Sequence, residues 1–513
     1  RNIVAVAKKI LNFFKTNFIF TIAAIIAIVS CFFVPIDKEY LNYFELNTLS
    51  CIFLLLLVIA AIKAVKIKAK PNTSAPAINP TEDEANDYAK KLSEMVKVPT
   101  ISLRGNDDLS QFYKLHEVMK KNFPLVFSKL ECTEIEGNLL FKWAGKDPKR
   151  NGILLMGHQD VVTADEPNWD RDPFSGEIAD GNIHGRGSMD CKSTVFSEFQ
   201  AIEELLRDGF VPECNVYIGS SHNEGIGGGG IPLALQYFKE NDIEFETVLD
   251  EGGAIIDPPL AGMKCKCAMM AVHEKGRRRI ICTANEETSH AGLSGNVNTP
   301  VARMSAFINE VNSKNIFIKR LYPQVKAMFE DLCPYTPFPM RMLFSNLWCF
   351  GWLLKKVIPK VNAQAGAMLG TSCTFFEVHG TYESRECVAK ATLRCVDYDD
   401  QEQDLAEIKK IAEKYNVTVT DGDYNEYHKP ADMSKEAFNY TKKCIAEIFP
   451  HVASAAYVLP AGTDARHLSE IRFAPIEMDA QQFASVHSEN ENISLKAVGN
   501  AVAFYKNYIK KYR

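Results

Sequence analysis

The sequence lacks the features that mark several common classes of protein. It has no Cys-x-x-Cys pair, no internal repeat, no low-complexity tract and no basic stripe beyond the N-terminal segment. Its net charge of −6 argues against a nucleic-acid partner, because phosphate backbones are bound by clustered positive charge. The cysteines are scattered and often lie in apolar runs, as Cys282 and Cys395 do, so we expect them to be reduced and mostly buried.

The composition is that of a globular protein, with 46% hydrophobic and 24% charged residues. Single hydrophobic cores stop growing at roughly 250 to 300 residues. A chain of 513 residues is therefore expected to form at least two domains.

Two uncharged apolar stretches near the N-terminus predict attachment to a membrane. Residues 18–34 are long enough to cross ~30 Å of hydrocarbon, and residues 46–62 are at the short end for a span. We interpret the pair, within residues 1–70, as a transmembrane hairpin. The alternative for the second stretch is a segment that dips into the bilayer or lies at its interface. Lysine and arginine flank the pair on both outer sides, so the positive-inside rule predicts that the large C-terminal portion is cytoplasmic.

The remainder of the chain predicts an α/β domain. Residues 71–86 are rich in Pro, Ser, Asn and acidic residues, which is typical of an exposed linker. Apolar runs at 153–156, 216–218 and 247–249 predict buried strands, and they alternate with helical patterns such as 193–207. This alternation indicates a largely parallel sheet with helices on its faces.

The sequence pattern changes near residue 268, and this change predicts a second domain inserted into the first. A charged, alternating stretch begins there, and a long helical segment and an aromatic-rich segment follow. We therefore divide the region after the linker into a catalytic domain made of residues 87–267 and 396–513, and an inserted domain made of residues 268–395.

Metal ligands of the right kind fall at the ends of the predicted strands, where ligands gather in open parallel sheets. Hydrolysis of an amide at neutral pH needs an activated water and stabilisation of the developing oxyanion, and a zinc ion supplies both. Paired zinc ions commonly share one bridging carboxylate. Two histidines and further carboxylates provide their other ligands. The residues that fit are His158, Asp190, Asp250 and His487.

Two further acidic residues suit the supporting roles. Asp160 lies on the same side of an extended segment as His158 and could accept the other ring N–H of that histidine. Glu224, after the second strand, is the natural general base. Each residue alone is more often a capping or structural group, and their joint spacing is what favours a metal site.

That spacing resembles the zinc metallopeptidases that include aminoacylase, acetylornithine deacetylase and the Gly-Xaa carboxypeptidases. The segment GHQDVVTADEPNWDRDPFSGEIADGNIHGRGSMDCKS, residues 157–193, is similar to the first signature of that family, and VLDEGG, residues 248–253, to its third-ligand motif. The segments EKG, SHAG, GTDAR and HSENENIS extend the resemblance over nearly all of the soluble region, and FSNLWCFGWLL resembles the carboxypeptidase branch in particular.

The resemblance implies a zinc-peptidase-like α/β catalytic domain with an inserted α+β lid and dimerisation domain. It also implies a first zinc on His158, Asp190 and Asp250, and a second zinc that shares Asp190 and uses His487. Glu224 would be the base, and the substrate a dipeptide or an N-acyl amino acid.

Three residues are implied to contact the substrate or its transition state. His290, in the inserted domain, would reach the active site of the partner subunit and steady the oxyanion, so a homodimer is expected; the alternative is an exposed polar residue. Arg466 and Arg394 are candidates for the substrate carboxylate, because a guanidinium can grip it with two hydrogen bonds. Either arginine could instead form an ordinary salt bridge.

The sequence departs from the family at the second zinc. The family has a second glutamate directly after the base, and this chain has Gly225, which offers no donor atom. His222 could in principle compensate. The family's Arg-Thr-Thr segment of the inserted domain also reads Gly370, Thr371 and Ser372 here. Two hypotheses follow: a zinc-dependent amidohydrolase, or a catalytically impaired relative that acts as a membrane-tethered binding or scaffold protein.

Overall fold

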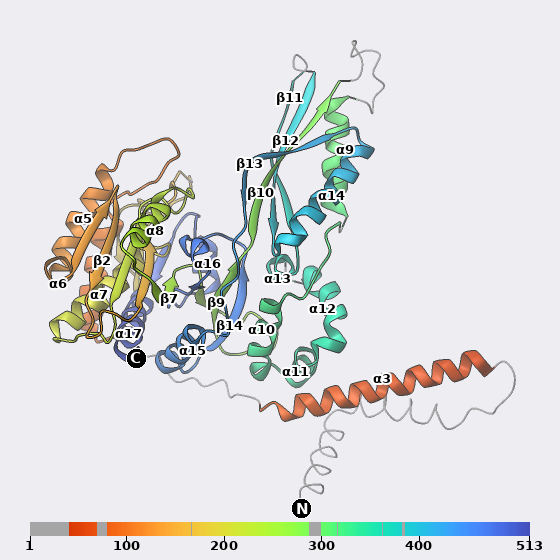
Figure 1. Cartoon of the computed structure of the whole chain (residues 1–513), viewed down its shortest axis with the longest axis horizontal. Coiled ribbons are helices and arrows are strands. Elements are labelled where there is room, and N and C mark those ends of the chain that lie inside the picture. The colour runs from red at the N-terminus through yellow and green to blue at the C-terminus, as the bar shows by residue number, and fades with distance from the viewer. Residues whose placement is uncertain are drawn as a thin grey trace, which may run out of the picture.

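The computed structural model describes residues 40–68, 80–165, 167–286, 299–314, 316–361, 363–381 and 385–512. Figure 1 shows a large lobe, called the catalytic lobe after the domain predicted from the sequence, a second lobe that extends away from it, and the long helix α3 (Tyr40–Lys66) beneath the second lobe.

The catalytic lobe is built on a nine-stranded mixed sheet whose centre is parallel. Strand β3 runs parallel to β6 and β7, as the apolar runs predicted, whereas β1, β2 and β8 pair antiparallel to their neighbours. The strands, in spatial order, are β1 (Glu131–Ile135), β2 (Asn138–Trp143), β6 (Val216–Ser221), β3 (Gly152–His158), β7 (Phe245–Asp250), β15 (Ile471–Arg472), β9 (Cys267–Glu274) and β14 (Ala453–Leu459), with β8 (Ala254–Ile256) on β9.

Helices cover both faces of this sheet because successive strand residues point to opposite sides. In β3, Ile153 and Leu155 join the larger hydrophobic core, whereas Leu154 and Met156 join the core beneath α8 (Gly230–Glu240). The helices of the larger core are α4 (Glu82–Val96), α5 (Ser110–Asn122), α6 (Pro124–Lys129), α7 (Lys192–Arg207), α15 (Glu436–Ile448) and α17 (Leu495–Lys511). Burial on both faces accounts for the continuous apolar runs in the sequence.

The second lobe contains an antiparallel four-stranded sheet in the order β11 (Ser372–Thr381), β12 (Glu386–Cys395), β10 (Gly276–Asn285) and β13 (Thr418–Glu426). Helices α9 (Pro300–Ser313) and α14 (Tyr398–Lys414) pack on it. The strand distribution differs from the predicted insertion, 268–395. Strand β9 belongs to the large sheet, and β13 belongs to the small one because it pairs with β10.

The remaining elements link or support the lobes. Helix α10 packs on β14 and leads into the helices that follow it. Strands β16, β5 and β4 form a small antiparallel sheet, in which β16 comes from the C-terminal part of the chain. These elements are α10 (Pro323–Leu332), η2 (Cys333–Tyr335), α11 (Phe338–Phe344), α12 (Leu347–Val361), α13 (Ala363–Ala367), η3 (Asp464–His467), α16 (Ala480–Ser485), β4 (Ile178–Ala179), β5 (Asn182–His184) and β16 (Asn492–Ser494).

The N-terminal region differs from its prediction in two respects. Helix α3 (Tyr40–Lys66) contains the second apolar stretch, and in the described part of the chain no helix meets the length and hydropathy needed to span a bilayer. The first stretch, 18–34, lies outside the described residues. The linker prediction is wrong for residues 82–86, because α4 begins at Glu82 with a capping box from Thr81.

The cysteine prediction is confirmed for the described side chains from Cys132 to Cys444: these cysteines are free, and most are buried.

Candidate active site

The centre of the site is a carboxylate between two histidines. Asp190 lies in the turn before α7; its Oδ1 is 3.1 Å from Nε2 of His158 and its Oδ2 is 2.7 Å from Nε2 of His487. His158 is the last residue of β3, and His487 follows α16. Burial alone would raise the pKa of Asp190, but the hydrogen bonds from the two histidines hold that pKa low. Asp190 therefore lies between the two histidines that the sequence analysis assigned to different metal ions.

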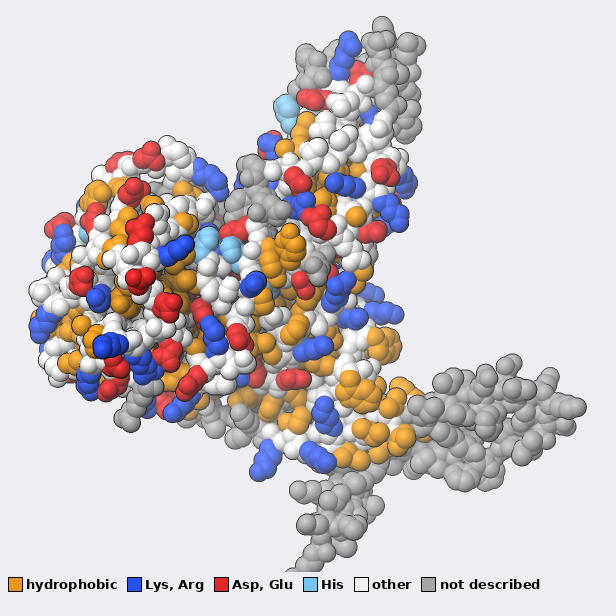
Figure 2. Space-filling model, in the orientation of Figure 1, with side chains coloured by type: hydrophobic (Ala, Val, Ile, Leu, Met, Phe, Trp, Pro, Cys, Tyr) orange, Lys and Arg blue, Asp and Glu red, His pale blue; other side chains and the backbone are white. Residues whose placement is uncertain are grey.

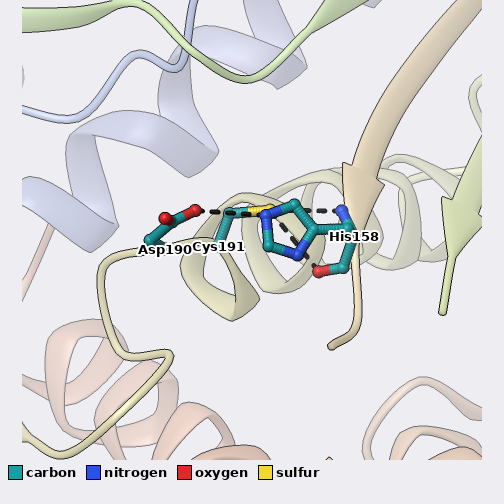
Figure 3. A group of neighbouring side chains, drawn as sticks. All are labelled: His158, Asp190 and Cys191. Carbon is teal, nitrogen blue, oxygen red and sulfur yellow. Dashed lines mark hydrogen bonds and ion pairs between the residues drawn. The ribbon is translucent and has the colours of Figure 1, made fainter. Parts of the chain in front are cut away.

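Cys191 completes the immediate surroundings of His158. Figure 3 shows Asp190 and Cys191 on the same side of the His158 ring, with the thiol against the main chain of that histidine. The amide nitrogen of His158 is 3.1 Å from Sγ of Cys191. Burial raises the pKa of this thiol well above its usual range, so it packs as a neutral group.

Asp160 contacts both His158 and the loop that carries Glu224. Nδ1 of His158 lies 3.0 Å from the main-chain oxygen of Asp160 and 3.3 Å from its Oδ1. The carboxylate of Asp160 also accepts the amide N–H groups of Glu224 and Gly225, each at 3.0 Å, and the hydroxyl of Ser102. With Nδ1 directed toward Asp160, Nε2 is left facing Asp190, as a metal-ligating histidine requires.

Glu224 stands in the loop after β6. Its Oε2 is 3.9 Å from Nε2 of His158. Burial, reinforced by Asp464 and Asp160, raises the pKa of Glu224 well above its usual range, although His158 acts in the opposite direction. A carboxylate with a raised pKa is suited to accept a proton at neutral pH.

Asp250 ends β7 but is not in direct contact with the histidines. Its oxygens accept main-chain N–H groups of Glu251 at 2.9 Å and of Ala465 at 2.7 Å. Burial, followed by the charge of Asp464, raises the pKa of Asp250 to about 7. Burial, together with Asp190 and Asp250, also raises the pKa of Glu251 well above its usual range.

Several buried acidic groups share this part of the site. Desolvation raises the pKa of Asp464 to about 6, as it raises those of Glu224, Asp250 and Glu251. His158, Asp190 and Cys191 each place a ligand atom within 4.8 Å of the others. Imidazole and carboxylate donors next to unbalanced negative charge fit a divalent cation such as zinc.

Gly225 leaves the second metal position with fewer donors. Asp190 and His487 would supply two side chains there, and His222 is not placed to supply a third. Nδ1 of His222 is 3.1 Å from Oδ1 of Asn138, and its Nε2 is 3.2 Å from Nδ2 of Asn223. The possibility that His222 compensates for the glycine is therefore not supported by its position.

Glu491 holds the turn that carries Asp190. Its Oε1 accepts the amide N–H groups of Gly187, Met189 and Asp190 at 2.8–3.1 Å. Its Oε2 pairs with Nη1 of the buried Arg186 at 2.9 Å. The HSENENIS segment thus supplies both His487 and the support for the bridging carboxylate.

The two candidate arginines come from different lobes and converge. Nη1 of Arg466, in η3, is 3.7 Å from Oε1 of Glu224, and its Nε is 3.3 Å from Oε1 of Glu426. Burial lowers the pKa of Arg394, on β12, and Glu426 and Arg466 are among the charges that act on it. Arg466 therefore already forms the ordinary ion pair that was its alternative, at a position that still faces the base.

A second group of potential ligands lies beside Arg466. Glu426, His428 and His467 place ligand atoms within 4.8 Å of one another. His428 Nε2 is 2.5 Å from Oε1 of Glu426, the carboxylate that also pairs with Arg466. The geometry is that of a hydrogen-bonded network around the arginine.

One predicted site residue lies in a segment that the structure does not describe, and other residues of the site were not predicted from the sequence. His290 falls within residues 287–298, which the structure does not describe. The sequence analysis did not single out Ser102, Asp464 or Glu491. Asp464 lies inside the GTDAR segment and Glu491 inside HSENENIS, so both could have been found there, whereas nothing in the sequence near Ser102 marks its contact with Asp160.

The chain resembles known proteins over most of its length. Residues 154–511 match the family described as Peptidase family M20/M25/M40. The chain is 30% identical over 447 residues to the probable carboxypeptidase S-like 2 of Dictyostelium discoideum, covering 83% of this chain and 85% of that protein. It is 26% identical over 447 residues to the human N-fatty-acyl-amino acid synthase/hydrolase PM20D1, covering 83% and 87%.

Solved structures share the fold at lower identity. A metallo-carboxypeptidase of the M20 family from Sulfolobus solfataricus superposes with a TM-score of 0.58 at 17% identity, covering 82% of this chain and 98% of that one. Human carnosine dipeptidase 1 gives a TM-score of 0.57 at 13% identity, covering 88% and 98%.

Proposed function

Because the chain belongs to peptidase family M20/M25/M40 and is thus a hydrolase of amide bonds, we propose that it cleaves an amide next to a free carboxylate, with a metal-activated water and Glu224 as general base. The observation that carries this proposal is the position of Asp190 between His158 and His487, with Glu224 3.9 Å from the first histidine.

The residues of the chain have separate tasks in this reaction. Zinc, held by His158, Asp190 and Asp250, would lower the pKa of water and polarise the substrate carbonyl. Glu224 takes a proton from the attacking water and returns it to the leaving amine. Asp160 fixes the ring of His158 and, through the amides of Glu224 and Gly225, the position of the base.

The proposed substrates are dipeptides or N-acyl amino acids. Relatives named for carboxypeptidase and N-fatty-acyl-amino acid hydrolase activity support both kinds of substrate. Arg466 lies 3.7 Å from Glu224, and Arg394 is close enough to Arg466 for their charges to interact; these two arginines are the groups proposed to bind the free carboxylate.

A homodimer is part of the proposal. His290 of one subunit would steady the oxyanion in the other subunit. Strand β11 supports this arrangement, because it lies at the edge of the small sheet and exposes Phe376 and Val378. Mixing inactive Glu224→Ala and His290→Ala proteins tests it: heterodimers should regain activity that neither variant has. Failure of mixed subunits to regain activity would count against a shared site.

Membrane attachment and a cytoplasmic active site stay proposals that rest on the apolar stretches and on the flanking lysines. Protease treatment of sealed vesicles tests the side of the membrane. A catalytic lobe digested from outside sealed, right-side-out vesicles would contradict the cytoplasmic placement.

The hydrolase itself is tested with the purified full chain. Turnover of dipeptides or N-acyl amino acids should disappear on chelation and return on addition of zinc. Gly225 motivates the second candidate, a membrane-tethered binding or scaffold protein with an impaired metal site. Absence of turnover across dipeptides, acyl amino acids and longer peptides, in a folded protein that holds zinc, would favour that candidate.

A further inference from the structure

Helix α12 presents an unusual outer face. Its inner residues Phe350 and Leu354 are buried, whereas Trp348 and Trp352, one helical turn apart, are 59% and 60% exposed. Tryptophan is usually well buried in soluble domains. Exposed indole rings in a row are typical of surfaces that meet the interface of a membrane, where an apolar ring with a polar N–H is favoured.

Lysines continue this face toward the end of the helix. Nζ of Lys356 lies 5.5 Å from the centre of the Trp352 ring, and Lys360 is exposed one turn further on. Val357 is exposed beside them. Indole rings followed by amines on flexible stems match the acyl and headgroup levels of an anionic bilayer, because lysine stems let the charge reach the headgroups.

Helix α3 extends the same surface. Its inner residues Ala60 and Ala64 pack against Met342 and Phe350. The side chain of Asn346 joins the two helices: Nδ2 donates to the main-chain oxygen of Ala60 at 3.1 Å, and Oδ1 accepts Nε1–H of Trp348 at 3.3 Å.

The outer side of α3 is apolar and exposed. Figure 2 shows hydrophobic side chains gathered over α3 and the adjacent helices, with lysine and arginine around them. From Phe53 onward, where side-chain exposure is described, the exposed large apolar residues of α3 are Phe53, Leu55, Val58, Ile59, Ile62 and Val65, and Lys63, Lys66 and Lys68 are exposed toward its C-terminal end.

We propose that this surface, the α3–α12 face, rests on an anionic lipid bilayer. It consists of the outer residues of α3 and of Trp348, Trp352, Lys356, Val357 and Lys360 of α12. A contiguous apolar area of this kind on a soluble protein marks an interaction site. The lysines select a negatively charged partner, and an interfacial position of α12 does not require any helix to span the bilayer.

The contact fixes the second lobe against the membrane by α12 as well as by the N-terminal segment. It does not depend on the proposed hydrolysis, so failure of either can be recognised separately. The bilayer contact is read from tryptophan emission, and the hydrolysis from product formation.

The tryptophan content of the chain makes the test specific. The chain has four tryptophans, Trp143, Trp169, Trp348 and Trp352, and none lies in residues 1–68. The predicted membrane stretches therefore contribute no signal. The full chain is reconstituted in vesicles with and without anionic lipid, and emission is quenched with lipids brominated along the acyl chain.

The expected result is quenching in the wild type that is mostly lost in the double variant W348F/W352F and retained in the control W169F. Circular dichroism and thermal unfolding verify that each variant is folded. A second pair, K356E/K360E, retains both indoles and should show weaker quenching in anionic vesicles than the wild type.

Two outcomes would overturn the proposal. One is wild-type emission that brominated lipid does not quench in anionic vesicles; if W348F/W352F then also lowers the mass of the assembly, the face contacts a second copy of the chain instead. The other is quenching that is undiminished in W348F/W352F.

Discussion

Restoring a carboxylate at position 225 tests how many metal ions the site holds. In the structure the amide of Gly225 donates to Oδ2 of Asp160 at 3.0 Å. A Cβ added at residue 225 would lie 3.3 Å from that oxygen, 3.5 Å from Cγ1 of Val162 and 4.0 Å from Oγ of Ser102. Gly225 is not among the glycines with positive φ, so a glutamate needs only a shift of a few tenths of an ångström from its neighbours.

The expected change in metal content follows from the number of donors. In the proposed site, Asp190 and His487 would give the second position two side-chain ligands, and catalytic zinc sites use about three. Gly225→Glu supplies the third. Metal per chain should rise from about one toward about two. At a metal concentration ~100-fold above the dissociation constant of the added site, the free energy of unfolding should increase by about 2.7 kcal/mol.

Elemental analysis and chemical unfolding of the purified protein measure both quantities. Gly225→Gln is the matched control, because it has the same size and lacks the charge. The reasoning fails if the wild type already holds two metal ions, or if Gly225→Glu binds no more metal than Gly225→Gln.

Three other predictions concern the base, its support and a buried lysine. Glu224→Gln should lower kcat by roughly 10²- to 10⁴-fold with unchanged metal content, and near-normal turnover would remove Glu224 from the role of base. Asp160→Asn should weaken metal binding ~10- to 100-fold in competition with a chelator, and Ser102→Ala less; equal affinities in all three proteins would contradict the orienting role. Burial lowers the pKa of Lys275 from 10.5 to about 7, so the unfolded chain binds more protons than the folded one between those values. Stability should therefore rise with pH in that window, by at most about 1.4 kcal/mol per pH unit from this group, and urea unfolding of Lys275→Met should lack this part of the slope.

The parts of the fold that could be predicted depend on local pattern. The apolar runs in β3, β6 and β7 identified the parallel centre of the sheet, because strands buried on both faces lack alternation. The ends of parallel strands meet at one edge, so His158 and Glu224 were expected together, and they lie 3.9 Å apart. The sequence was therefore sufficient to predict which site residues lie close together where the sheet itself brings their strands side by side.

The parts that could not be predicted depend on contacts between distant segments. The hydroxyl of Ser102 reaches Asp160 because residues near Ile101 run beside Val161 as an isolated bridge. Strand β9 belongs to the large sheet because it pairs with β14, and β13 belongs to the small sheet because it pairs with β10. The local sequence pattern near residues 268 and 395 does not reveal these pairings. The ion pair between Arg466 and Glu426 likewise joins two lobes.

Charge balance connects the missing ligand to the number of metal ions. Glu224, Asp250, Glu251 and Asp464 all have raised pKa values because burial leaves their negative charge poorly compensated. A divalent cation beside Asp190 would reverse this effect, since it stabilises the ionised forms. A further glutamate at position 225 would add another buried negative charge, which is tolerable only with a second cation. The glycine removes the ligand and the charge together, so a site with a single metal ion is electrostatically consistent, whereas two ions with these donors would leave the second one poorly held.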